Sequence, residues 1–158
     1  MFREMRNRDQ QLPRQACIDL LRANPRGVLS LLGDEGYPYG VPTNFWYCED
    51  DGCLYFHGGK QGHKVDAMNA NPRVSLCVMD QGRRKDGDWA MTFQSVVVFG
   101  RIEILDAGEQ AMDTVRKLSL QFTGDTGFIE REIQNYGART LIFRLVPEHI
   151  TGKWIREA

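Results

Sequence analysis

Apolar and polar residues alternate over much of the chain, with the two-residue period that is typical of β-strands. This pattern predicts strands over residues 27–32, 39–48, 53–57, 73–80, 91–105 and 139–146. The strand over 27–32 is apolar enough to be buried. Pro42 cannot donate to a strand ladder and marks an edge or a bulge, and Gly100 predicts a bend or bulge. Pro147 is expected to end the last strand.

Three- and four-residue spacing of apolar positions predicts helices over 13–23, 107–122 and 127–136, and Gly137 is placed to cap the last of them. A further short helix ends before Pro72. The tail 149–155 stays apolar and aromatic to its end, so we expect it to dock on other parts of the fold. Many short strands with a few amphipathic helices predict a small antiparallel barrel or sandwich with helices outside, and the pattern leaves the two undecided.

Length and composition indicate an ordinary globular protein. The 158 residues suffice for one domain, 1–158, and 42% are hydrophobic and 26% charged. A net charge of -1 argues against nucleic-acid binding, and the basic run 83–85 lies in a polar segment, 81–88, expected to be a solvated loop. We find no apolar stretch of membrane-spanning length and no leader pattern, so we expect a cytoplasmic protein without membrane partners.

The four cysteines, Cys17, Cys48, Cys53 and Cys77, form no C-x-x-C pair, which argues against a zinc site, so we expect no metal. Cys48 and Cys53 flank a predicted hairpin and could face each other. In a reducing cytosol they should remain thiols.

The most informative stretch is a glycine-rich loop between a strand and the short helix, residues 56–64. Lys60, His63 and Lys64 gather where the helix begins, and cations there should cost about 0.3–1 kcal/mol each because of the helix dipole. The cost would be offset by an anion such as a phosphate on the helix start, which both lysines hold while the glycines let the backbone approach. The alternative is a flexible, solvated basic loop. The loop lacks the Walker A spacing, and the chain has no Gly-x-Gly-x-x-Gly motif.

Four segments in the same order resemble the pyridoxamine 5′-phosphate oxidase-like split-barrel proteins, and in particular their 5-nitroimidazole resistance (Nim-like) branch. They are 36–44 (GYPYGVPTN), 54–67 (LYFHGGKQGHKVDA), 71–75 (NPRVS) and 95–100 (SVVVFG). The resemblance covers about the whole chain. It implies a six-stranded antiparallel split β-barrel of Greek-key type with flanking helices. It also implies a homodimer with two flavin sites at the subunit interface, and the apolar run 96–99 would supply a face for the second subunit.

The resemblance also implies the positions that hold the flavin, FMN or possibly FAD. Lys60 and Lys64 would supply charge to its phosphate and Gly62 and His63 backbone donors. The remaining candidates are Pro42, Thr43, Asn44, Phe56, His57, Ser95, Val96, Lys153 and Trp154. Thr43 and Asn44 could instead form a solvent face. Lys153 and Trp154 would reach the flavin of the partner subunit or simply pack.

His57 is the candidate catalytic residue because histidine titrates near neutrality. The alternative is a stacking or hydrogen-bonding residue with no proton role, and no general acid or base is assigned. The C-terminal segment 151–158 lacks the arginine and histidine cluster of true pyridoxamine phosphate oxidases, which argues against vitamin B6 chemistry.

The resulting hypothesis is a flavin-dependent reductase of a small acceptor such as a nitroimidazole, with a reduced nicotinamide as donor. The alternatives are a binder of haem or a deazaflavin, and a flavin-binding protein without enzyme activity.

Overall fold

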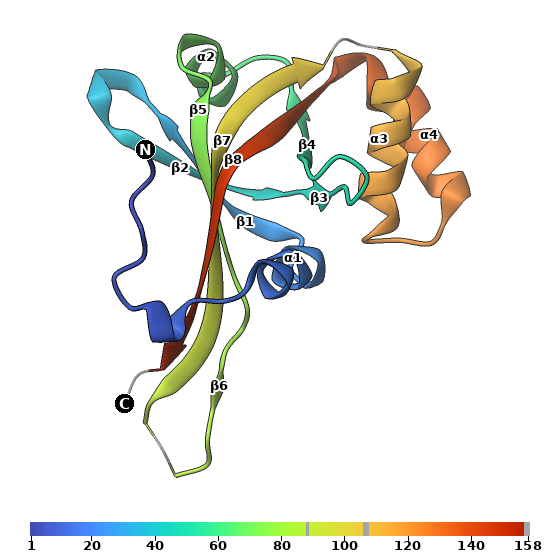
Figure 1. The fold of residues 1–158 in the computed structure, drawn as a ribbon. Helices are drawn as coiled ribbons and strands as arrows, with labels where there is room; N and C mark the ends of the chain where they lie inside the picture. Colours follow the sequence, from blue (N-terminus) through green and yellow to red (C-terminus); the bar gives the residue numbers. More distant parts are fainter. Residues whose placement is uncertain (88, 106–107, 157–158) are drawn as a thin grey trace.

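The computed structural model describes residues 1–87, 89–105 and 108–156. Its centre is one antiparallel sheet of eight strands in the order β2-β1-β5-β7-β8-β4-β3, with β6 paired to β7 (Figure 1). The strands are β1 (Arg26–Leu32), β2 (Pro38–Asn44), β3 (Trp46–Tyr47), β4 (Leu54–Gly59), β5 (Arg73–Met79), β6 (Arg83–Arg84), β7 (Met91–Leu105) and β8 (Thr140–Arg156). Because β3 and β6 have only two residues each, six strands carry the sheet, as predicted.

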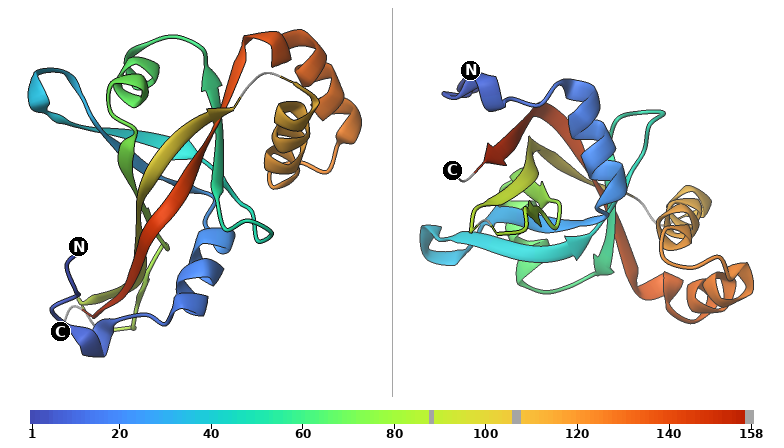
Figure 2. Two further views of the ribbon diagram at one scale, coloured as in Figure 1. Left: turned by 45° about the horizontal axis from the view of Figure 1, so that its top comes forward. Right: turned by 90° about the horizontal axis from the view of Figure 1, so that it is seen from below.

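Phe45 joins the two ends of this sheet. β2 pairs with β1 at one end of the strand order and β3 pairs with β4 at the other, and only Phe45 separates β2 from β3. Its side chain is fully buried and its N–H donates to the Pro25 carbonyl at 3.0 Å. The predicted strand 39–48 is therefore two strands, and the sheet curls into the split barrel that the sequence resemblance implied (Figure 2).

The barrel interior is filled by every second residue of the long strands. Leu29, Leu76, Val98, Phe56 and Phe143 are all fully buried. The prediction that 27–32 is buried as a whole was wrong. Val28 is 39% exposed because it lies on the outer face of the sheet, whereas its neighbour Leu29 points inward.

A bulge lets the last strand continue beyond its proline. Phe99 pairs with His149 but Gly100 pairs with Pro147, so Glu148 is the extra residue. The predicted irregularity at Gly100 is confirmed, whereas the prediction that Pro147 ends the strand was wrong. A residue at a bulge is not required to donate its N–H to the neighbouring strand, so a proline, which has no N–H, is tolerated there. The tail 149–155 is accordingly strand, paired with β7, which confirms that it docks.

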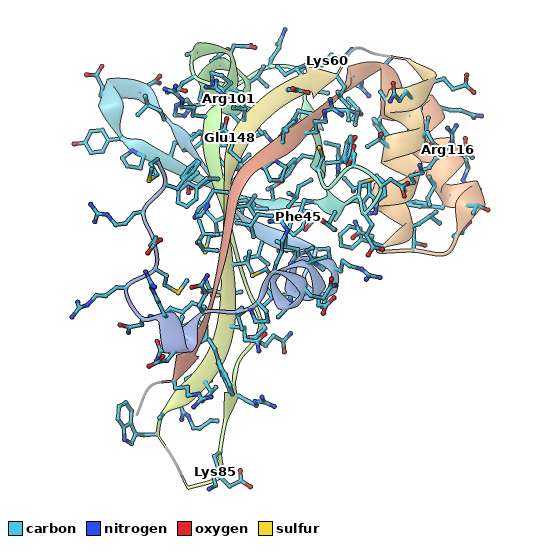
Figure 3. The ribbon with its side chains drawn as sticks, in the orientation of Figure 1. Phe45, Lys60, Lys85, Arg101, Arg116 and Glu148 are labelled. Atoms are coloured by element: carbon cyan, nitrogen blue, oxygen red, sulfur yellow. The ribbon has the colours of Figure 1, made fainter. Side chains whose placement is uncertain are left out.

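The segment 81–88, expected to be a loop, contains β6. Arg83 and Arg84 pair with Thr92 and Met91, where β7 and β8 extend past the other strands of the sheet. Position 88 lies outside the described residues. Both arginines are exposed, so no apolar pattern marks the strand. Lys85 lies near the tip of this protruding hairpin (Figure 3).

Four helices flank the barrel: α1 (Arg14–Ala23), α2 (His63–Ala70), α3 (Glu109–Leu120) and α4 (Thr126–Tyr136). α1 buries Cys17, Leu20 and Leu21 against the barrel, while α3 and α4 stand together at one side (Figure 1). The predicted helix 107–122 begins in part outside the described residues and ends at Leu120. Gly137 caps α4 as predicted, and a 3-10 turn (Gly137–Arg139) follows it, so β8 begins at Thr140. Among the described residues, no helix is long and apolar enough to cross a membrane.

Candidate functional site

The glycine-rich loop and the short helix form as predicted. β4 ends at Gly59, and Gly62 caps α2 with φ 113°, a left-handed conformation that strongly favours glycine. The Gly62 carbonyl accepts from the N–H groups of Val65 and Asp66, and no side chain caps the helix. The start of α2 therefore presents backbone donors at the positive end of the helix dipole.

Lys64 lies inward against β4 rather than out in solvent. Its ammonium is 5.5 Å from the centre of the Phe143 ring, and a Cβ on Gly58 would come within 3.0 Å of it. Burial lowers the pKa of Lys64 because the charged form loses hydration. Within the part of the chain that the structure describes, no carboxylate pairs with it. This cation is therefore positioned to gain from an incoming anion.

His57 stands near the end of β4, opposite Ile142 of β8. Although the residue is exposed, the packing around its ring lowers the pKa, and the charge of Lys64 lowers it further. The imidazole is consequently neutral at pH 7. It can then donate and accept one hydrogen bond each, but it adds no positive charge.

The other two basic residues of the loop have partners within the chain. The Lys60 ammonium donates to the Ala138 carbonyl at 2.6 Å, at the upper end of the molecule (Figure 3). The His63 ring stacks on Tyr39 with centroids 4.1 Å apart, and its Nε2 lies 3.6 Å from the Asp34 carboxylate. The two lysines expected to act together thus differ, since only Lys64 is left without a polar partner in the described residues.

The candidates on β2 lie at the edge of the sheet, as Pro42 predicted. Pro42 is exposed opposite Val28, and the Thr43 hydroxyl donates to the Asn44 carbonyl at 3.2 Å. The Asn44 side-chain oxygen accepts from Arg26 Nε at 2.9 Å. Asn44 lines the same cavity as His57, so the structure brings these two together.

The remaining candidates are not brought to this loop. The side chains of Phe56 and Val96 are fully buried in the core, so only their backbones could meet a ligand. Ser95 pairs with Lys153, and the Arg156 guanidinium lies 3.7 Å from the Trp154 ring. Ser95 is paired with the last residue of β5, whereas the first residue of β5 follows α2. Ser95, Lys153 and Trp154 therefore lie about 20 Å from the α2 loop, measured along the strands.

A cavity of about 370 Å³ opens beside His57, between the sheet and the helix pair. It is lined mostly by apolar and aromatic side chains of α3, α4 and their connection: Asn44, His57, Val115, Leu118, Ser119, Phe122, Thr123, Phe128, Ile129, Glu132, Ile133, Tyr136, Gly137 and Thr140. The sequence predictions missed the α4 members. Phe128, Glu132 and Tyr136 are spaced by four and so share one helix face, but spacing does not say what that face covers.

The cysteines take no part in this site. All four are free thiols, and Cys48 N–H donates to the Cys53 carbonyl at 2.9 Å across the hairpin. Burial, with the nearby Asp51 carboxylate, raises the pKa of Cys53 to about 11. The thiol is therefore protonated and unreactive near neutral pH.

Comparison with known proteins gives one family match and many similar structures. Residues 13–154 match the model of the pyridoxamine 5′-phosphate oxidase family. A candidate 5-nitroimidazole antibiotic resistance protein from Bacteroides thetaiotaomicron is 19% identical, with a TM-score of 0.77 over 92% of this chain and 87% of that one. No curated protein matches the chain significantly.

Two structures described as FAD-binding proteins also share the fold. The one from Mesorhizobium loti is 28% identical, with a TM-score of 0.66 over 92% of this chain and 97% of that one. The one from Mycobacterium smegmatis is 20% identical, with a TM-score of 0.67 over 94% and 99%.

Proposed function

Since the chain belongs to the pyridoxamine 5′-phosphate oxidase family, we propose that it is a flavin-dependent oxidoreductase that reduces a small acceptor. FMN is the proposed cofactor, and FAD fits the same phosphate site. The FAD-binding protein from Mesorhizobium loti, similar to this chain over nearly its whole length, supports a flavin.

The observation that carries the proposal is Lys64. A half-buried ammonium without a carboxylate partner in the described residues, beside the open start of α2, has lost hydration without gaining a counter-ion. A phosphate bound there would restore favourable interactions to the ammonium and to the helix N–H groups together. It would also compete with the Ala138 carbonyl for the Lys60 ammonium.

The ring of the flavin would extend from this phosphate site toward Asn44 and His57, which face one cavity. The bound flavin supplies the electron-transfer chemistry. The chain's residues bind and orient it: Asn44 offers an amide beside the ring, and neutral His57 can donate or accept a hydrogen bond without competing with the phosphate for charge. His57 remains the proposed catalytic residue.

A second copy of the chain is proposed to complete each site. Ser95, Lys153 and Trp154 lie about 20 Å along the strands from the α2 loop of their own chain, so they could serve a flavin only if it is bound by the partner. A homodimer with two equivalent sites meets this requirement.

The proposed acceptor is a nitroaromatic such as a 5-nitroimidazole, with a reduced nicotinamide as electron donor. The order of the four sequence motifs supports this choice of branch. Reduction of a 5-nitroimidazole by NADH or NADPH in the presence of the purified protein is the direct measurement. A purified protein that is yellow but supports no turnover with either donor would point to flavin binding without this activity.

Replacing Lys60 and Lys64 together by alanine is expected to empty the flavin site without unfolding the protein, because neither side chain belongs to the buried core. We expect Lys64→Ala alone to lose more flavin than Lys60→Ala, whose ammonium already has a partner. The measurement is the amount and mass of pigment released from equal quantities of protein. Lys85→Ala, on the protruding hairpin, is the matched control. Full flavin retention in the double variant would contradict the phosphate assignment.

A further inference from the structure

The helix pair α3–α4 is held beside the barrel in a way that keeps the cavity open. Arg116 of α3, which is labelled in Figure 3, makes two hydrogen bonds to Glu130 of α4, at 2.5 and 3.0 Å. Gln121, after α3, donates to the Phe45 carbonyl at 3.1 Å and so fixes the helix pair to the closing point of the barrel. The cavity between the helix pair and the barrel is therefore bordered by elements that are fixed relative to each other.

The cavity has an apolar floor and an aromatic rim. Leu118 and Ile129 are buried beneath it, whereas Phe122, Phe128 and Tyr136 around it are 49%, 47% and 50% exposed. Three half-exposed rings around one hollow are unusual for a surface that solvent alone covers. A volume of about 370 Å³ lies at the small end of the range for ligand pockets, which suits a compound of one or two rings.

Among the described lining residues, the charged side chain is a carboxylate. Glu132 is the lining carboxylate, and none of the described lining residues is lysine or arginine. His57 is uncharged at neutral pH for the reasons given above. A carboxylate ligand beside Glu132 would be repelled by it, whereas a cationic ligand would be attracted to it.

The two arginines that contact lining residues already have partners: Arg26 donates to the Asn44 side-chain oxygen at 2.9 Å, and the Arg139 guanidinium lies 5.3 Å from the centre of the Tyr136 ring. Lys64, beside His57, is assigned to the flavin phosphate.

We propose that the α3–α4 cavity is the acceptor pocket, and that it selects a flat aromatic compound of one or two rings that is neutral or cationic and carries no phosphate or carboxylate. The rim aromatics stack on or pack around the ring, and Glu132 receives a basic substituent. His57 and Asn44 line this pocket, and His57 also adjoins Lys64 of the proposed phosphate site, so a ring bound in the pocket would lie beside the flavin ring. This inference rests on the proposed function. It predicts that the pocket disfavours vitamin B6 phosphates, because they are negatively charged.

Three probes that share one ring test the selectivity: benzamidine, a cation; benzyl alcohol, neutral; and benzoate, an anion. Binding is measured by isothermal titration calorimetry on the purified protein with whatever flavin it carries. We expect benzamidine and benzyl alcohol to bind, and benzoate to bind at least about tenfold more weakly than benzamidine.

Glu132→Gln should weaken benzamidine about twofold to fivefold, the range for an exposed charge pair, and leave benzyl alcohol unchanged. The matched control is Glu109→Gln, which removes a carboxylate at the start of α3 that does not line the cavity. Phe128→Ala should weaken benzamidine and benzyl alcohol alike, because it removes part of the aromatic rim.

Flavin content, measured on the same samples, separates this inference from the function on which it rests. Unchanged flavin in Glu132→Gln and Phe128→Ala, with altered probe binding, supports a pocket distinct from the cofactor site. Loss of flavin in Phe128→Ala would show that the cavity holds the cofactor, and equal binding of all three probes would overturn the proposed selectivity. A wild-type protein without flavin that still binds the probes would overturn the proposed function and leave the character of the cavity standing.

Discussion

At the scale of single residues, the site depends on two neighbouring basic side chains, Lys64 and His57, whose pKa values are both lowered by the packing around them. Lys64 lies against Phe143 and Gly58, and its charge adds to the burial that lowers the pKa of His57. The sequence identified both residues by their place in a glycine-rich motif. It could not show that Lys60 is bonded to Ala138 while Lys64 is not, because that difference depends on a turn 78 positions away in the chain.

The lowered pKa of His57 predicts a pH dependence of stability. A histidine that binds a proton less readily in the folded state than in the unfolded one stabilises the fold above its unfolded pKa of about 6.5, and this contribution is lost as the pH falls. The free energy of unfolding of the flavin-free wild type should therefore decrease between pH 7.5 and 5.5, and less steeply in His57→Gln. Urea denaturation across this range is the measurement. Parallel curves for the two proteins would contradict the environment assigned to His57.

At the scale of elements, the bulge between β7 and β8 decides how far the last strand runs. Gly100 is required there because a Cβ would come within 2.1 Å of the Val146 carbonyl oxygen. The glycine signalled an irregularity from the sequence alone. The sequence did not show that Pro147 lies opposite Gly100, at the bulge, where its missing N–H is tolerated. This pairing depends on the register of two strands whose residues are 47 positions apart.

Gly100→Ala is accordingly expected to reduce the free energy of unfolding by about 2 kcal/mol or more, since backbone must move to admit the methyl group. Urea denaturation compares it with Gly124→Ala, where an added Cβ would meet nothing within 4 Å and the change should stay within about 0.5 kcal/mol. If the two variants are equally stable, the close approach at the bulge does not constrain the fold.

At the scale of the whole molecule, the outer face of the sheet is more apolar than is usual for a surface that only solvent covers. Val28, Cys77 and Val97 form a cross-strand row on that face, and Met79 beyond it is 55% exposed. We propose that a second copy covers this face, which would also bring Lys153 and Trp154 to the partner's flavin.

Val28→Asp should therefore give a monomer and reduce the flavin content, because a charge buried at the centre of an apolar interface is unfavourable. Leu120→Asp is the control, since it places the same charge on an apolar residue of α3 that is 51% exposed, against 39% for Val28. Sedimentation velocity gives the mass and absorbance gives the flavin. A wild-type monomer that retains flavin would contradict the proposed arrangement.

The sequence by itself determined where most of the strands and helices lie, the glycine-rich loop before α2 and the family. These features follow from local periodicity, from the backbone preferences of glycine and proline, and from motifs in a fixed order. Only the tertiary structure decided that Phe45 closes the barrel, that β8 continues past Pro147, and that Phe122, Phe128 and Tyr136 surround one cavity beside His57. Each of these depends on which distant segments meet, and the periodicity within one segment does not carry that information.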